Sequence, residues 1–513
     1  MSIRLNGTKF YSAKEQSVNM IAEIALSLLL VWLMWSVVTT YKTRSKMPPG
    51  PFPFPFVGNF PQMLCDSPDP FSKLAEKYGD IYTLSFPTGN TVVLNTASLM
   101  REARFGKKAG IFVGRSPGSV YPFNEMLGDD YIMTDYSPIY VFRKKVFLSA
   151  LHAFESTVKH ESSTYAVNAL LKEIGSKEKK AFSPGKLVHA SIVAQIWKMI
   201  TTKKVSLNDP VVKSIIEFDE LLGKQALKGT FYQMIPFASY LPSQFSRDIK
   251  RAVQVRGAIF LPEFRAHLET WQPNMIRDLT DSLIGAFKKE ILKENSKDVG
   301  SLDDIPALMT DMFVAGAGTT SSVIAWFILY MVLHKNVQEK IQNELDMVVG
   351  KDRMPVLDDA KNMPYLQAVL CEVLRIANVL SFVGTNAIRD TTISGYHIPK
   401  GTLVCPNLKR VHHDEREWPE PDVFKPERFL DSEEKFVGWT KLHGFMPFGA
   451  GRRECTGQSL ARIMIITFAS TLLHCHEIAL PDGAEEPNTE ILAHAHATVL
   501  RPQDFEVVLK KRF

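Results

Sequence analysis

The sequence predicts a mainly α-helical protein with small β-sheets and an N-terminal transmembrane helix. Three features lead to this fold class. Most of residues 141–297 have the apolar spacing of helices and are rich in Lys, Glu, Leu and Ala. Residues 81–85 and 91–95 are apolar, alternating stretches around a Pro-Thr-Gly-Asn turn, which predicts a β-hairpin. An apolar run near the N-terminus is long enough to span a bilayer.

Composition and charge narrow the class of protein. The chain has 513 residues, of which 45% are hydrophobic and 22% charged, as in globular proteins. The net charge of +5 is too diffuse for a nucleic-acid footprint, so we expect no nucleic-acid partner, whereas an anionic membrane or an acidic partner suits it. The cysteines include no CxxC pair, which argues against a disulfide framework or a zinc site and favours a reduced, cytosol-facing domain. They are Cys65, Cys371, Cys405, Cys455 and Cys475.

The chain is expected to have four parts. Residues 1–19 are a short N-terminal segment, 20–41 the transmembrane anchor, 42–60 a basic and proline-rich hinge, and 61–513 one large catalytic domain. Glu23 alone interrupts the apolar run of the anchor, and its Trp and Tyr residues suit the membrane interface. We therefore expect an uncleaved helix rather than a signal peptide. Positive charges flank both ends, so charge counting does not decide its orientation.

A second uncharged stretch lies in the middle of the chain. Ser301 and Asp304 have the spacing of a capped helix start, and the chain from Met312 to Leu333 carries no charge. This stretch is either a second membrane span or a helix buried in a large core. Two glycines and a Thr-Thr-Ser-Ser cluster favour the buried helix, with something flat or bulky close to its backbone.

Residues 448–457 carry the chemistry. They read Phe-Gly-Ala-Gly-Arg-Arg-Glu-Cys-Thr-Gly and lead into a helical stretch. Gly451 and Gly457 allow the backbone to approach a planar ligand. Cys455, at the start of a helix, can be held as a thiolate by the helix dipole and backbone N–H groups. Arg453 is placed to bind an anionic group of the same ligand. The alternative is a buried structural cysteine in a glycine-rich turn.

This segment resembles the cysteine loop of the cytochrome P-450 superfamily, F-x-x-G-x-R-x-C-x-G. All its fixed positions are present, as Phe448, Gly451, Arg453, Cys455 and Gly457. The resemblance implies a cytochrome P-450 fold with a long central helix over the haem, and makes the catalytic part of the chain a haem-thiolate domain. It implies that the cofactor is haem b, that Cys455 is the axial ligand of its iron, and that Arg453 holds a haem propionate.

A Glu-x-x-Arg motif comes earlier in the chain, in the family's order. Glu372 and Arg375 share a helix face and can pair with each other and with Arg428 of a Pro-Glu-Arg-Phe segment. Alone, this spacing would indicate only a solvated ion pair. The resemblance implies that the trio locks the core on the haem side.

Residues 315–320, Ala-Gly-Ala-Gly-Thr-Thr, resemble the family's oxygen-binding groove. The resemblance implies catalytic roles for Gly316, which makes room, and for Thr319 and Thr320, with Thr319 directing protons during dioxygen activation. One position departs from the pattern, because the residue before the threonine is usually Asp or Glu and is Gly318 here. Proton delivery must then use water or another acid, or the enzyme is slow, leaky toward peroxide or non-oxygenating.

The haem cradle departs from the family's pattern as well. The usual W-x-x-x-R appears as Tyr140 and Lys144, so a Lys point charge replaces an Arg fork at one propionate. The proline that normally follows Arg375 is missing, and Leu-Ser-Phe at 380–382 bears on specificity more than on the fold. Substrate contacts are expected in 116–133, 231–241, 313–316, 378–385 and 494–498.

The resemblance to animal microsomal members implies a monooxygenase that inserts one atom of O2 into a lipophilic substrate of the steroid, fatty-acid or xenobiotic class. Because the anchor and this domain account for the whole chain, electrons from NADPH are expected through a separate NADPH–cytochrome P-450 reductase, with cytochrome b5 as an additional donor. A basic docking face is expected at Arg143, Lys144, Lys145 and Arg452. We expect a single-pass protein of the endoplasmic reticulum membrane whose catalytic domain faces the cytosol.

Two other functions stay open. One is a haem-thiolate isomerase or dehydratase that acts on lipid peroxides without a reductase; Gly318 supports it and Thr319 counts against it. The other is a membrane-tethered haem-binding protein without turnover. Turnover with reductase and NADPH separates the monooxygenase from both, and consumption of lipid hydroperoxide without NADPH separates these two from each other.

Overall fold

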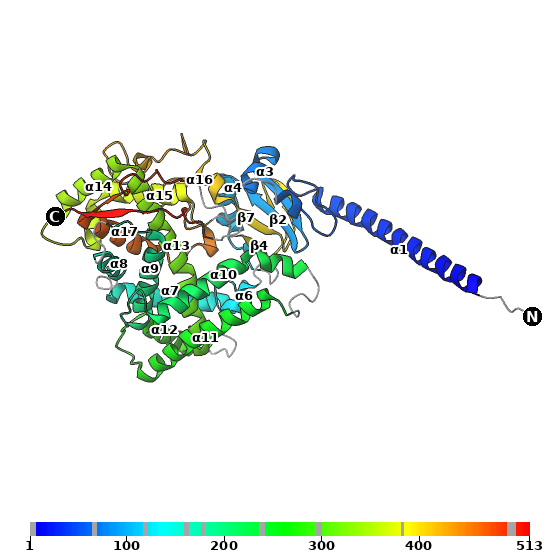
Figure 1. Cartoon of the computed structure of the whole chain (residues 1–513), viewed down its shortest axis with the longest axis horizontal. Coiled ribbons are helices and arrows are strands. Elements are labelled where there is room, and N and C mark those ends of the chain that lie inside the picture. The colour runs from blue at the N-terminus through cyan, green and yellow to red at the C-terminus, as the bar shows by residue number, and fades with distance from the viewer. Residues whose placement is uncertain are drawn as a thin grey trace, which may run out of the picture.

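A computed structural model shows a mainly α-helical protein with small sheets, which confirms the predicted fold class (Figure 1). It describes residues 7–63, 69–115, 122–128, 130–158, 164–175, 180–234, 242–293, 300–380, 384–489 and 499–513. The helices are α1 (Gly7–Arg44), α2 (Phe60–Met63), α3 (Pro70–Tyr78), α4 (Ala97–Arg104), α6 (Phe123–Leu127), α7 (Pro138–Val158), α8 (Tyr165–Gly175), α9 (Pro184–Thr201), α10 (Pro210–Met234), α11 (Gln244–Thr270), α12 (Leu279–Lys293), α13 (Ile305–Leu333), α14 (Lys335–Val348), α15 (Pro364–Ala377), α16 (Leu408–His412) and α17 (Gln458–Cys475). The strands are β1 (Ile81–Phe86), β2 (Gly89–Leu94), β3 (Phe112–Gly114), β4 (Thr385–Ala387), β5 (Thr391–Ile393), β6 (Tyr396–Ile398), β7 (Leu403–Pro406), β8 (His476–Ala479) and β9 (Val508–Lys511).

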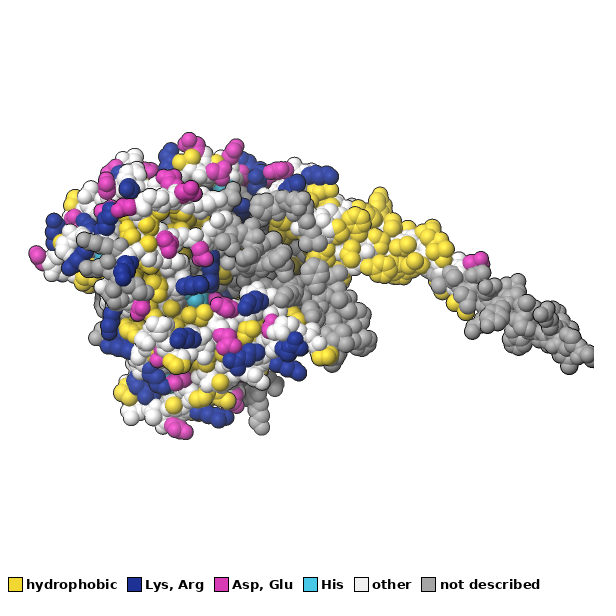
Figure 2. Space-filling view, viewed as in Figure 1, with side chains coloured by type: hydrophobic (Ala, Val, Ile, Leu, Met, Phe, Trp, Pro, Cys, Tyr) yellow, Lys and Arg dark blue, Asp and Glu magenta, His cyan; other side chains and the backbone are white. Residues whose placement is uncertain are grey.

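Helix α1 projects from the body as a separate rod (Figure 1). Its stretch Leu26–Arg44 is apolar enough to cross a membrane, and none of it is buried against the body. Figure 2 shows these side chains as a hydrophobic sleeve. Such a surface is unfavourable in water and favourable in lipid, as the predicted anchor requires. The helix runs past residue 41 into the predicted hinge, since the first helix-breaking proline is Pro48.

Hydrogen bonds tie the hinge to strand β1. The Thr83 backbone N–H donates to the Pro49 carbonyl (2.7 Å), and its hydroxyl donates to the Pro48 carbonyl (2.9 Å). Arg44, at the end of α1, donates to the carbonyls of Pro51 (2.6 Å) and Thr83 (2.8 Å). Prolines can accept but not donate, so this segment lies along the edge of the sheet. The junction between α1 and the body is therefore fixed.

The predicted hairpin, β1 and β2, opens a five-stranded sheet of order β1-β2-β7-β4-β3. Strands β1 and β2 are antiparallel, with Tyr82 opposite Val93, and β2 runs parallel to β7. Two-stranded sheets β5-β6 and β8-β9 complete the β-structure of the described residues. The large sheet thus joins the N-terminal hairpin to residues 385–406, far away in the chain.

Helix α13 is the long central helix. Its approach is capped as predicted, because the Ser301 hydroxyl accepts from the Asp303 backbone N–H (3.2 Å) and the Asp304 carboxylate accepts from the Ser301 backbone N–H (3.3 Å). It packs against α9, α11, α15 and α17, and 78% of its apolar window is buried. The second uncharged stretch is therefore a core helix, because neighbouring helices and not lipid cover its surface.

Helix α17 positions the cysteine loop. It begins at Gln458, directly after the loop of residues 448–457, and it packs against α13, α14 and α15. Nearly all of its second half is buried in the main core. The loop is therefore held at the end of a rigid helix that also contacts the central helix.

Candidate active site

The loop around Cys455 is closed by its own backbone. The Cys455 N–H donates to the Phe448 carbonyl (2.9 Å), and the Glu454 N–H donates to the Gly451 carbonyl (3.1 Å). Gly451 has φ +78°, and a Cβ there would lie 2.6 Å from the Arg104 carbonyl oxygen. Only glycine fits this position, since both conformation and space exclude a side chain.

Gly457 has a different role from Gly451. Its φ of −89° is one that any residue adopts, and a Cβ there would meet no atom within 4 Å. The space beside its backbone is therefore open. This opening is what the predicted approach of a planar ligand needs, and it lies two residues after Cys455.

The Cys455 thiol is open to solvent although protein surrounds it. Its side chain is accessible to solvent, yet surrounding protein buries it enough to raise the pKa of the thiol, while a hydrogen bond from the Gly457 backbone N–H acts in the opposite direction. Because the pKa of this solvent-accessible thiol is raised, it becomes a thiolate only when a strong cation lies at its sulfur. A bound metal ion supplies such a cation and deprotonates a coordinating thiol.

Three arginines converge beside the loop: Arg104, Arg115 and Arg453. Burial and the charges of the other two lower the pKa of Arg115 to about 10. Its Nε is buried and has no hydrogen-bond partner among the residues that the structure describes. The partners that the described residues supply to the three guanidinium groups are carbonyl and hydroxyl oxygens, with no carboxylate among them. Within the described residues no carboxylate binds the guanidinium groups directly, although Asp135 and Asp130 lie near Arg453, so carboxylates such as haem propionates fit the cluster.

Arg453 is held in place from two directions. Its guanidinium lies 3.7 Å above the Tyr140 ring and donates to the carbonyls of Val113 (2.8 Å) and Thr134 (2.8 Å). Sequence reasoning identified Arg453 and missed Arg104 and Arg115. No motif or periodicity marks these two, and only the folded chain shows them beside the loop.

Tyr140 and Lys144 also reach the loop. Lys144 Nζ donates to the Arg452 carbonyl (2.5 Å), and the Tyr140 hydroxyl donates to the same oxygen (3.4 Å). Burial lowers the pKa of Lys144. One turn of α7 therefore contacts the residue next to Arg453, which is where a second propionate contact was predicted.

The predicted basic docking face is wrong for Arg143. Its side chain is buried, and it donates to the Asp304 carboxylate (2.9 Å) and the Asp130 carbonyl (2.8 Å). Lys145 forms an ion pair with Glu290. A run of cations in the sequence spreads around a helix, so one of its members points inward and pairs with the cap of α13.

Helix α13 exposes a narrow face in the middle of the core. Ala315 is exposed and Thr319 partly exposed, and the Thr319 hydroxyl donates to the Ala315 carbonyl (2.6 Å). Of the three predicted catalytic residues, Thr319 lies on this face, Gly316 borders it and Thr320 is buried away from it. Thr320 is 3% exposed, and a Cβ at Gly316 would lie 3.1 Å from Ile196 Cδ1. Of the three, Thr319 is therefore the residue best placed to meet a ligand.

The Glu-x-x-Arg trio is assembled in the core. Arg375 donates to both carboxylate oxygens of Glu372 (2.7 Å each), with both side chains fully buried. Arg428 Nε lies 3.4 Å from the same carboxylate, and the Lys425 backbone N–H donates to it at 2.9 Å. The Arg375 Nη1 donates to the His412 carbonyl (2.7 Å). Every charge in this trio has a partner, as buried charges require.

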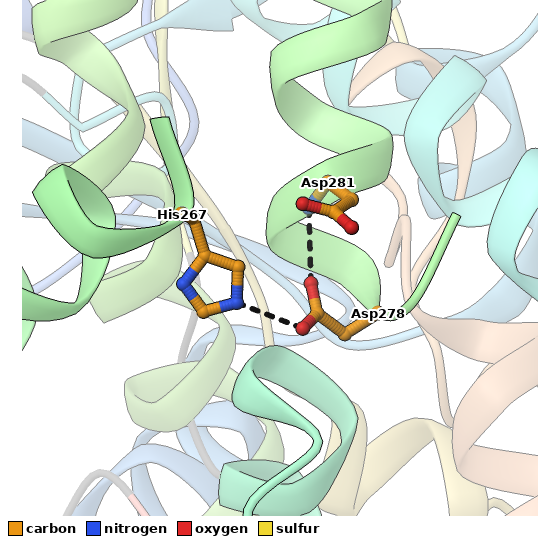
Figure 3. A group of neighbouring side chains, drawn as sticks. All are labelled: His267, Asp278 and Asp281. Atoms are coloured by element: carbon orange, nitrogen blue, oxygen red, sulfur yellow. Dashed lines mark hydrogen bonds and ion pairs between the residues drawn. The ribbon is translucent and has the colours of Figure 1, made fainter. Parts of the chain in front are cut away.

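A cluster of metal-ligand type, His267, Asp278 and Asp281, lies elsewhere in the molecule, between α11 and α12 (Figure 3). His267 Nε2 and Asp278 form an ion pair (2.8 Å), and Asp278 accepts from the Asp281 backbone N–H (3.0 Å). Arg277 binds both carboxylate oxygens of Asp281 (2.6 and 2.8 Å). Because these groups are hydrogen-bonded to one another and to Arg277, we interpret the cluster as a structural link between the two helices.

A helical fold with a solvent-accessible cysteine, a cation cluster beside it and an exposed face on the central helix defines a haem-thiolate protein. The family model described as "Cytochrome P450" matches residues 48–509. The chain belongs to this family. It is therefore a cytochrome P450 monooxygenase that uses haem b, and the family takes electrons from a redox partner.

Relatives agree over nearly the whole chain. A steroid 17-alpha-hydroxylase/17,20 lyase of Ictalurus punctatus is 30% identical, covering 95% of each chain. Cytochrome P450 1A1 of Canis lupus familiaris is also 30% identical, again over 95% of each. A solved zebra fish cytochrome P450 with progesterone superposes with a TM-score of 0.74 and 28% identity, over 86% of this chain and 98% of that one.

The predicted substrate contacts are described only in part. Residues 116–121, 129, 235–241, 381–383 and 494–498 lie outside the described residues. Within the described part, Phe313 is buried in the main core, and Val314 to Gly316 border the exposed face of α13.

Proposed function

We propose that this enzyme inserts one atom of O2 into a lipophilic substrate of the steroid class, with Cys455 as the axial ligand of its haem iron. The observation that carries the proposal is the solvent-accessible thiol of Cys455, which lies beside an open space at Gly457 and an arginine cluster whose guanidinium groups bind no carboxylate among the described residues. The steroid class is preferred because one relative is named a steroid hydroxylase and one solved relative contains progesterone.

Residues of the chain would act on two sides of the haem, some by binding its propionates and others by bordering the reaction space. When bound, the haem supplies dioxygen activation and the transfer of one oxygen atom. Arg453 and Arg115, with Lys144 and Tyr140, would bind its propionates by charge-assisted hydrogen bonds. The exposed face of α13 would border the reaction space, and the Thr319 hydroxyl would hold a proton donor there.

The source of electrons and the location form the other part of the proposal. Electrons would come from NADPH through a separate cytochrome P-450 reductase, with cytochrome b5 as a further donor. Helix α1 would anchor the protein in the endoplasmic reticulum membrane with the body facing the cytosol, since an unburied apolar helix of this length requires lipid. Lys144, Lys145 and Arg452 remain candidates for the docking face, without Arg143.

The absorption spectrum of the reduced protein with carbon monoxide tests the ligand. We expect the strongly red-shifted band of a thiolate-ligated carbonyl in the wild type, its loss in Cys455→Ser, and its retention in Cys475→Ser, whose thiol lies at the far end of α17. A folded, haem-loaded wild type without this band would refute the proposal.

Progesterone tests the substrate class. Titration should shift the haem absorption spectrum, and incubation with reductase and NADPH should yield a hydroxylated product. A planar aromatic compound serves as the comparison, because a relative of similar identity is a cytochrome P450 1A1. Product from the aromatic compound alone would contradict the steroid class and leave the oxygenase proposal standing.

A further inference from the structure

Gly318 of α13 occupies the position where the family usually has an acid, and an acidic side chain of another helix lies beside it. A Cβ at Gly318 would lie 3.7 Å and 3.8 Å from the two carboxylate oxygens of Asp219, and 3.8 Å from Arg501 Nη2. Asp219 belongs to α10, which packs against α13. The carboxylate of Asp219 therefore sits in van der Waals contact with the place from which an acidic side chain at 318 would extend. Thr319, the polar residue of the exposed face, is the next residue along.

Hydrogen bonds from α13 to the Leu500 carbonyl hold the adjacent residue, Arg501, near Gly318. The Leu500 carbonyl accepts hydrogen bonds from the Ser322 hydroxyl (2.5 Å) and the Trp326 indole (3.1 Å), both on α13. The Arg501 Nη2 lies 3.3 Å from an Asp219 carboxylate oxygen. Within the described part of the chain, Asp219 is therefore paired with one cation, Arg501, whose side chain is 48% exposed and so remains partly hydrated.

A histidine also lies close to Asp219. His189 Nε2, on α9, lies 3.5 Å from the Asp219 carboxylate, and its Nδ1 is hydrogen-bonded to the Ser321 hydroxyl (3.0 Å). The Ser321 hydroxyl donates to the Gly318 carbonyl (3.1 Å). Because the Ser321 hydroxyl donates its proton to the carbonyl, it accepts a hydrogen bond from Nδ1 of His189. The proton of a neutral His189 is then on Nδ1, and the lone pair of Nε2 faces Asp219.

These contacts accommodate Asp219 in two protonation states. As a carboxylate it pairs with Arg501, and as a carboxylic acid it can donate to the lone pair of His189 Nε2. Burial raises the pKa of Asp219, while the charge and hydrogen bond of Arg501 act in the opposite direction. Burial and the charge of Arg501 lower the pKa of His189 to about 3, so this histidine stays neutral around pH 7. Asp219 is a quarter exposed, which leaves room for water.

We propose that Asp219 supplies from α10 the acid that Gly318 does not, and relays protons through water toward Thr319 during turnover. This inference rests on the proposed oxygenase function. Asp219 acts here as a positioning residue for proton delivery, because it reaches the reaction space through Thr319 and solvent.

The proton balance of the relay is simple. The carboxylic acid of Asp219 gives its proton to a bridging water, which passes one of its own toward Thr319, and the carboxylate that remains is balanced by Arg501. A proton from bulk water, reached along the exposed side of Arg501, restores the acid. No electrons move in this step. The overall reaction needs these protons, because the second oxygen atom of O2 leaves as water.

The first test does not depend on turnover. The infrared stretching band of carbon monoxide bound to the reduced enzyme reports charges near the open side of the haem. We expect this band to move with pH in the wild type and in Glu220→Gln, and to stop moving in Asp219→Asn. Glu220 is the matched control, since it lies on the same helix with a largely exposed side chain. A band that titrates alike in all three proteins overturns the proposal.

The second test measures proton delivery. With reductase and NADPH, Asp219→Asn should raise the ratio of hydrogen peroxide released to oxygen consumed, and should slow reduction to water by about tenfold or more, as loss of a general acid does. The double variant Asp219→Asn/Gly318→Asp should restore the wild-type ratio, because a carboxylate returns beside Arg501. Unchanged partition in Asp219→Asn, or no recovery in a folded double variant, overturns the relay.

A third variant keeps the idea testable if Asp219→Asn fails to hold haem. Arg501→Gln leaves Asp219 in place and removes its cation, so the pH midpoint of the carbon monoxide band should rise. An unchanged midpoint contradicts the proposal. Absence of the thiolate-type carbonyl spectrum in the wild type would instead be a failure of the oxygenase function itself.

Discussion

The two sides of the active site balance their buried charges in different ways. On the cysteine side, formed by the loop 448–457 and the trio Glu372, Arg375 and Arg428, each charge of the trio has a partner at hydrogen-bond or ion-pair distance. On the α13 side, formed by Ala315, Thr319 and the buried acids around them, the charges are incompletely paired. Asp311, for example, has one carboxylate oxygen without any hydrogen-bond partner.

This difference matches what each side has to do. A core that keeps a loop at a fixed place gains from a rigid, fully paired network, which the trio forms and the cluster of Arg104, Arg115 and Arg453 does not. A side that passes protons needs groups that can change charge, and burial with partial pairing moves pKa values in that direction. We therefore expect that removing one charge from the trio lowers the free energy of unfolding. Removing an incompletely paired acid from the α13 side should instead raise it.

The largest expected effect is on the cysteine side. Glu372→Ala leaves Arg375 as an unpaired buried cation, which should cost about 3–5 kcal/mol of unfolding free energy and prevent normal haem content. Urea unfolding and haem absorbance measure both. Glu339→Gln, an exposed change on α14, is the control. A double change, Glu372→Leu with Arg375→Met, should cost less than Glu372→Ala; a greater cost would contradict the argument from unpaired charge.

A pair of glycine variants should separate folding from haem binding. Gly451→Ala forces a side chain into a left-handed conformation 2.6 Å from a carbonyl oxygen, which should destabilise the protein by about 2 kcal/mol or more. Gly457→Ala meets no atom and has an ordinary φ, so it should leave the unfolding of haem-free protein unchanged and lower haem content. A normal haem content in Gly457→Ala would show that the ligand does not use the open space at Gly457.

The smallest effect should appear on the α13 side, with the opposite sign. Burial and the charge of Asp130 raise the pKa of Asp311 well above its usual range, and burial raises the pKa of Asp130 to about 6. An acid with a raised folded-state pKa costs stability above that pKa and not below its unfolded value. Asp311→Asn keeps the acceptor for the Tyr131 N–H (3.0 Å) and removes the ionisable group, so it should make the protein more stable at pH 8.

The pH dependence provides the check for this last variant. The gain in thermal midpoint should shrink between pH 8 and pH 5, because the stability cost of an acid with a raised folded-state pKa falls as the pH falls. An equal gain at both pH values would point to better packing instead of relieved charge.

The sequence predicted the elements whose signal is local. The helix start at Ser301, the hairpin of β1 and β2 and the glycine-rich loop around Cys455 each depend on residues a few positions apart, so spacing was sufficient. It failed where the outcome depends on which face of a helix meets which neighbour. Arg143 was placed on a docking surface and is buried against Asp304, and Thr320 was grouped with Thr319 although the two side chains have different surroundings.

By itself, the sequence determined the fold class, the anchor-like helix and the identity of the cysteine loop, because helix period, apolar length and motif spacing are properties of neighbouring residues. The tertiary structure alone decided that Arg104 and Arg115 join Arg453 and that Asp219, Arg501 and His189 meet at Gly318. These groups come from segments separated by tens to hundreds of residues. Their pKa values and pairing depend on burial and distance, which exist only once the helices have packed.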